Sequence, residues 1–234
     1  MSIVSSRPIK YSRSFKRLMD SSIVKKIDVD WIQIHLVRRH IASHLLTNMT
    51  SITHQWIDKY QNSCSGGEMR GFRGQSIEQF VIDSINFIGT SIGRNFHAIK
   101  GDLDKKLLAI PDAPHISHQH QVDVHVYLDD RFVAAIECKA YLDKCYYTRA
   151  CDDFSLFRKF GHDIRTYIFA FEDSISAESK IFVDYINGNV CDDVFYMVDG
   201  KRSSSKPIYH PDHRKSINYV KFYRFIQKMF ALLD

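Results

Sequence analysis

The stretch QVDVHVYLDDRFVAAIECKAYL, residues 121–142, decides the fold. Two runs of alternating β-forming residues, 121–128 and 132–141, flank a short polar turn, and this pattern predicts a β-hairpin. Helical patterns dominate the chain before the hairpin, and strands alternate with helices after it. That order predicts an α/β fold with a mixed central β-sheet flanked by helices.

Hydrophobic periodicity places the other elements. A helical N-terminal region is expected at 1–60, followed by a glycine-rich loop at 61–75. Ser76 and Gln79 form a capping-box pattern, which predicts that a helix begins at this point. The remaining expected elements are strands at 96–100, 106–110, 166–172 and 194–198, helices at 144–160 and 175–187, and a C-terminal amphipathic helix.

The composition is typical of a globular protein. The chain has 234 residues, of which 44% are hydrophobic and 25% charged, so we expect a single domain with its catalytic core at 75–200. No apolar run approaches the ~20 residues of a membrane-spanning helix, and no secretory signal is recognisable. Five cysteines without a C-x-x-C pair fit a reduced, cytoplasmic protein. The net charge of +5 is compatible with a polyanionic partner.

Register decides whether Asp123 of the first strand meets Glu137 of the second. A two-residue loop would pair Asp123 with Ile136 and send the two carboxylates to opposite faces of the sheet. A three-residue loop at 129–131 pairs Asp123 with Glu137, with their Cβ atoms about 5 Å apart. We predict the three-residue loop, because it gathers the polar residues of both strands on one face.

The hairpin then presents two carboxylates and an amine together. Glu137 and Lys139 share one strand face, about 7 Å apart along the strand. Adjacent carboxylates repel each other unless a cation lies between them, and Mg²⁺ prefers carboxylate, carbonyl and water oxygens. Such an ion polarises a phosphodiester and makes a bound water more acidic. Asp123, Glu137 and Lys139 are therefore the predicted catalytic residues, with Lys139 holding the water or neutralising charge on the phosphate.

Asp123, thirteen intervening residues and then Glu137-Cys138-Lys139 on a hairpin resemble the motif of the PD-(D/E)XK nuclease superfamily. The resemblance covers roughly residues 75–172 and implies a restriction-endonuclease-like fold. It also implies that Asp123, Glu137 and the main-chain carbonyl of Cys138 bind the Mg²⁺ ion.

Two further positions bear on this resemblance. Glu78 matches an acidic residue that the family often carries on a helix before the hairpin, which implies a catalytic role near the metal. The ordinary alternative is a first-turn residue stabilised by the helix dipole. The family's first aspartate often follows a proline, whereas Asp123 follows Val122.

Within the superfamily, the size of the chain and the lack of helicase motifs look most like a type II restriction endonuclease. This implies Mg²⁺-dependent, sequence-specific hydrolysis of double-stranded DNA that leaves 5′-phosphates. A homodimer is expected, because a two-fold protein matches a palindromic duplex. A structure-selective repair or junction-resolving nuclease, a non-catalytic DNA-binding module and an interaction protein without a nucleic-acid role remain as alternatives.

Basic residues in loops and at one helix start are the expected DNA contacts. Flexible basic loops suit phosphate and groove contacts, and a solvated surface is the alternative for each residue. Tyr146 and Tyr147, at the start of the helix after the hairpin, are close enough to the catalytic face to touch the cleaved strand. The charged candidates are Arg70, Arg73, Lys144, Arg149, Lys201, Arg202, Lys206, Arg214 and Lys215.

Four histidines, His115, His118, His120 and His125, cluster in the sequence before and within the hairpin. A structural zinc site needs four ligands, and no complete set is evident here. A surface or DNA-facing role is expected instead, with His125 at the edge of the catalytic face.

Overall fold

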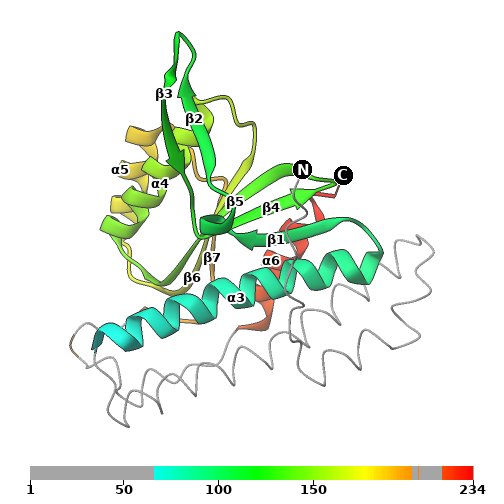
Figure 1. The fold of residues 1–234 in the computed structure, drawn as a ribbon. Helices are drawn as coiled ribbons and strands as arrows, with labels where there is room; N and C mark the ends of the chain where they lie inside the picture. Colours follow the sequence, from blue (N-terminus) through cyan, green and yellow to red (C-terminus); the bar gives the residue numbers. More distant parts are fainter. Residues whose placement is uncertain (1–65, 202–204, 206–217, 234) are drawn as a thin grey trace.

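The computed structural model describes residues 66–201, 205 and 218–233. The expected helical region at 1–60 lies outside the described residues. Within them, helices and strands form the mixed α/β fold that the sequence predicts (Figure 1). No helix in the described part of the chain is both long and apolar enough to cross a membrane.

A five-stranded mixed sheet forms the centre of the fold, in the order β1-β4-β5-β6-β7. β1 (Phe96–Lys100), β4 (Val124–Leu128) and β5 (Arg131–Leu142) are each antiparallel to their neighbour in this series. β6 (Arg165–Asp173) and β7 (Asp193–Tyr196) continue the sheet parallel to β5. The continuous apolar run of β6 follows from this position, because parallel strands are covered on both faces.

Helices cover both faces of the sheet (Figure 1). α3 (Gly66–Ile92) and α6 (Tyr219–Phe230) bury one apolar cluster against it, and α4 (Lys144–Lys159) and α5 (Ala177–Asn187) bury a second cluster on the other side. Alternate residues of β5 contribute to the two clusters, as the two-residue period of a strand requires. This layering confirms the predicted architecture.

The glycine-rich segment is helical where the structure describes it. α3 runs from Gly66 through three further glycines before residue 76, so the predicted loop at 61–75 is wrong from Gly66 onward, as is a helix start at Ser76. Each glycine costs a helix interior about 1 kcal/mol relative to alanine. The helix persists because its later turns, from Ile77 to Ile88, are buried against the sheet, and tertiary packing supplies most helical stability.

The hairpin between β4 and β5 has a tighter turn than predicted. Asp129 and Asp130 separate the strands, and both have a positive φ, 48° and 64° respectively. Two successive left-handed residues are typical of a type I′ turn, whose twist matches that of antiparallel strands. The predicted three-residue loop at 129–131 is therefore wrong, because Arg131 already pairs with Leu128.

A β-bulge in β5 restores the register that a two-residue turn would lose. Val133 is the extra residue of this bulge, and it shifts the pairing by one position from Val126 to Val124. Extending the observed register by one residue places Asp123 opposite Glu137, as predicted. Because of the bulge, Val133 and Phe132 each lie on the opposite face of the sheet from the one that simple alternation along β5 gives. Val133 packs with the α3–α6 cluster and Phe132 with the α4–α5 cluster.

A second hairpin projects from the body of the fold (Figure 1). β2 (Lys106–Ile110) and β3 (Ala113–His120) form a separate two-stranded sheet, which we call the ribbon. A short 3-10 helix, η1 (Gly101–Leu103), leads from β1 toward its root. His115 and His118 are exposed on the ribbon, in agreement with the expected surface role.

His120 and His125 are buried, so the expected surface role is wrong for both. The ring of His125 contacts Phe132 and Phe157, with centroids 4.8 and 5.9 Å apart, beneath α4. Burial, reinforced by the nearby charge of Lys106, lowers the pKa of His125 from 6.5 to about 4. This imidazole is therefore neutral at pH 7.

We expect the free energy of unfolding to fall as the pH drops from about 6.5 to 4, because in that window the unfolded chain binds a proton on His125 that the folded chain does not. The full contribution is on the order of 3 kcal/mol. His125→Phe should flatten this part of the pH profile in urea titrations followed by circular dichroism. The same replacement at the exposed His115 is the control and should keep the wild-type slope. A wild-type slope in His125→Phe would contradict the assignment.

Candidate active site

Asp123, Glu137 and Lys139 meet in one cluster, as predicted. The Nζ atom of Lys139 lies 3.1 Å from Oδ2 of Asp123 and 2.9 Å from Oε2 of Glu137. The main-chain N–H of Cys138 donates a hydrogen bond to the same Asp123 oxygen at 2.8 Å. The Lys139 ammonium therefore contacts both carboxylates, and the Cys138 amide adds a second hydrogen bond to Asp123.

The backbone around Gly101 positions Asp123, which lies in the bend just before β4. The N–H of Gly101 donates to the main-chain carbonyl of Asp123 at 3.1 Å. A Cβ atom at position 101 would lie only 1.9 Å from the carbonyl oxygen of Val122, so this close approach requires glycine. Gly101 is not among the predicted site residues, and its only signal in the sequence is that it directly follows the predicted strand at 96–100.

The two carboxyl groups have opposite pKa shifts. Burial, the hydrogen bond with Asp123 and the Asp123 charge raise the pKa of Glu137 well above its ordinary value, although Lys139 opposes this. Burial also acts to raise the pKa of Asp123, but hydrogen bonds from Glu137, Lys139 and the Cys138 amide outweigh it and lower the pKa. As the pH falls, Glu137 is therefore the carboxyl group of the pair that binds a proton first, and Asp123 stays ionised to lower pH.

Lys139 is held in its charged form. Burial alone would lower its pKa, but the charges of Glu137 and Asp123 and the hydrogen bonds to both raise it overall. A permanently charged ammonium donates hydrogen bonds but accepts no proton. Within this cluster Lys139 can therefore position a water or stabilise a phosphate oxygen.

The donor set of the cluster fits a hard divalent cation. Asp123 and Glu137 offer carboxylate oxygens, and the carbonyl of Cys138 points to the same strand edge as its N–H, which faces Asp123. The described residues contain no group of three or more His, Cys, Asp or Glu side chains arranged to hold a metal. An ion here would rely on two carboxylates, one carbonyl and water, which is the kind of shell that Mg²⁺ keeps.

Glu78, on α3, lies at the edge of the cluster. Its Oε2 atom is 3.3 Å from Nζ of Lys100, on β1. Burial and then the negative charge of Asp123 raise the pKa of Glu78, against the opposing charge of Lys100. Glu78 and Asp123 therefore interact electrostatically, and a catalytic role for Glu78 remains a prediction.

The charged DNA-contact candidates occupy different parts of the fold. Lys144 and Arg149 are exposed on α4, and Lys201 is exposed with its Nζ atom donating to a main-chain carbonyl at 3.2 Å. Arg70 and Arg73 lie on α3 instead of the expected loop. Outside the described residues lie Arg202, Lys206, Arg214 and Lys215.

The two tyrosines proposed to touch the cleaved strand differ in exposure. Tyr147 is fully buried, and its hydroxyl donates to Asp184 of α5. The predicted DNA contact of Tyr147 is therefore wrong, because its side chain serves the packing of α4 against α5. Tyr146 is partly exposed.

Comparison with known proteins relates the chain to restriction enzymes over part of its length. It is 25% identical over 114 residues to the type II restriction enzyme DdeI of Desulfomicrobium norvegicum. The match covers 43% of this chain and 47% of that enzyme, so the chain spans about half the length of this relative. No family model matches the chain.

Gly101→Ala should weaken the binding of a divalent ion at least tenfold, because the added methyl group would displace the backbone that carries Asp123. The affinity can be measured with Mn²⁺ by electron paramagnetic resonance, at a temperature where circular dichroism shows a folded variant. Gly74→Ala is the matched control, since its Cβ would meet nothing closer than Oε1 of Glu78 at 4.0 Å. Wild-type affinity in Gly101→Ala would show that this glycine does not position Asp123.

Proposed function

We propose that the protein is a Mg²⁺-dependent type II restriction endonuclease that cuts double-stranded DNA at a specific sequence and leaves 5′-phosphates. The observation that carries the proposal is the Lys139 ammonium held between the carboxylates of Asp123 and Glu137. The partial likeness to a type II restriction enzyme supports this class of nuclease. In this proposal residues 1–234 form a single nuclease domain of the PD-(D/E)XK type.

Asp123, Glu137 and the carbonyl of Cys138 would bind Mg²⁺, which supplies polarisation of the phosphodiester and a more acidic bound water. The raised pKa of Glu137 opposes this role, and the charge of a bound ion would lower that pKa again. Lys139 donates a hydrogen bond to the attacking water or to the phosphate oxygen on which negative charge develops. Water attacks phosphorus in line with the leaving oxygen, and no covalent enzyme intermediate forms.

Double-stranded DNA is the proposed partner, and a homodimer is the proposed active form. One copy of the cluster can cut one strand, so breaking both strands at a palindromic site requires two copies related by two-fold symmetry. The exposed Lys144 and Arg149 on α4, together with Lys201, are the described basic residues proposed to contact phosphates.

Supercoiled plasmid incubated with Mg²⁺ should give discrete linear fragments, and EDTA should abolish the cleavage. Lys139→Gln and Asp123→Asn should each lower the cleavage rate by on the order of a hundred- to a thousandfold, because each removes a charge from the reacting centre. Lys180→Gln is the matched control, since Lys180 also forms a lysine–aspartate ion pair, at 2.6 Å to Asp184, but on α5. Its rate should equal that of the wild type.

The same digest separates the alternatives. Cleavage of branched substrates without discrete plasmid fragments would indicate a structure-selective nuclease. Salt-dependent DNA binding with no cleavage, and with equal binding by wild type and Lys139→Gln, would indicate a non-catalytic DNA-binding module.

A further inference from the structure

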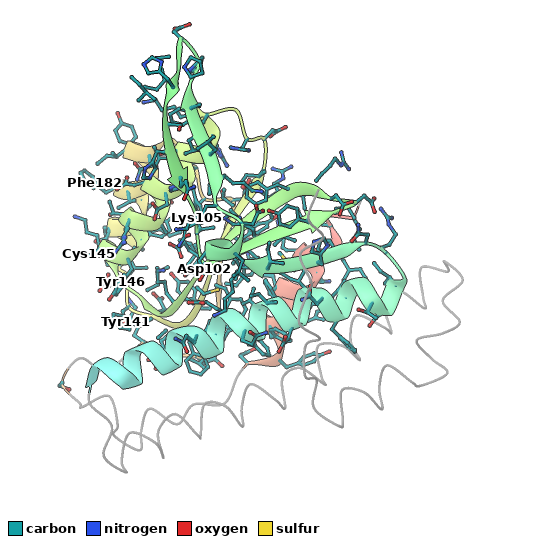
Figure 2. All side chains as sticks on the ribbon, in the orientation of Figure 1. Asp102, Lys105, Tyr141, Cys145, Tyr146 and Phe182 are labelled. Carbon is teal, nitrogen blue, oxygen red and sulfur yellow. The ribbon has the colours of Figure 1, made fainter. Side chains whose placement is uncertain are left out.

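Two tyrosines extend the catalytic cluster toward the start of α4. Tyr141 lies two residues after Lys139 on β5, so it is on the same face and about 7 Å further along the strand. Tyr146 is in the first turn of α4, where its N–H donates to the capping carboxylate of Asp143 at 2.9 Å. The two rings meet edge to face with centroids 5.4 Å apart, and Figure 2 shows both side chains at this end of the sheet.

This tyrosine pair lies at the rim of the cluster. Both residues are partly exposed, and the ring of Tyr146 packs against the α4–α5 cluster. Tyrosines are common at binding surfaces, because the ring packs against the protein while the hydroxyl can bond a polar ligand. A hydrogen bond with Tyr141 raises the pKa of Tyr146, and the charge of Lys139 is near enough to act on the same phenol. Tyr146 therefore remains a neutral hydrogen-bond donor.

We propose that Tyr141 and Tyr146 form an uncharged phosphate-binding subsite, which holds the DNA strand next to the phosphodiester that Lys139 faces. This inference rests on the proposed function, because it takes the cleaved strand to pass along β5. Phenol hydroxyls donate hydrogen bonds to phosphate oxygens and position a duplex without reading its sequence. The pair is a positioning element, whereas Lys139 and the two carboxylates reach the reacting phosphate itself.

Tyr141→Phe and Tyr146→Phe test the subsite, since each removes a hydroxyl and keeps the ring. The probe is a fluorescent 40-base-pair duplex of random sequence in Ca²⁺, because a phosphate contact does not depend on sequence. Each variant should weaken the Kd about five- to tenfold. The slope of log affinity against log salt should stay at the wild-type value, because a neutral donor releases no counterion from DNA.

Tyr185→Phe is the matched control, because Tyr185 is 85% exposed on α5; its Kd should equal that of the wild type. Thermal unfolding of each variant checks the fold, and Tyr146→Phe decides alone if Tyr141→Phe is unstable.

Wild-type Kd values in the folded variants, or a reduced salt slope, would overturn the subsite even if the wild type cleaves plasmid. If the wild type binds the duplex but never cleaves DNA, the nuclease proposal fails while the binding data still decide the subsite. A wild type that binds no duplex overturns both.

Discussion

A buried ammonium lies between two carboxylates in this structure, and the surrounding fold keeps the three groups together. Only 8% of the Glu137 side chain and 19% of the Lys139 side chain are exposed. Burying ion pairs in this way contributes little net stability, because desolvation offsets most of the attraction. The cluster is therefore better explained by chemistry than by folding. The apolar layers on both sides of β5 hold these polar groups at one end of the sheet.

Backbone geometry, more than side-chain packing, brings the cluster together. The bulge at Val133 sets the register of β4 against β5, and the close approach of Gly101 holds the bend that carries Asp123. The amide of Cys138 then fixes the orientation of the Asp123 carboxylate. Each of these devices acts through the main chain, so none depends on the flexible end of a side chain. This arrangement fixes the positions of the two carboxyl groups to within a fraction of an ångström, as a preorganised site requires.

Much of the fold follows from hydrophobic periodicity, and the failures have identifiable physical causes. The strands at 96–100 and 106–110 are predicted residue for residue, because apolar runs bounded by turn residues have few alternatives. The bulge at Val133 does not show in the alternation of apolar and polar residues. The predicted pairing of Asp123 with Glu137 is therefore correct, although the predicted three-residue turn is wrong. The burial of His125 could not be predicted either, because the sequence does not show which apolar rings will surround its side chain.

The ribbon determines where residues can be added to this chain without moving Asp123. β3 ends at His120, and the chain reaches Asp123 only three residues later. At the root of the ribbon, Lys106 forms an ion pair with Asp104 at 2.6 Å, and the ring of His120 hydrogen-bonds to the main-chain carbonyl of Asp153 on α4. An insertion at the exposed tip, 111–112, would leave this anchorage intact, whereas one at the root would move Asp123. The outer end of the ribbon is thus the part of this hairpin expected to tolerate added residues.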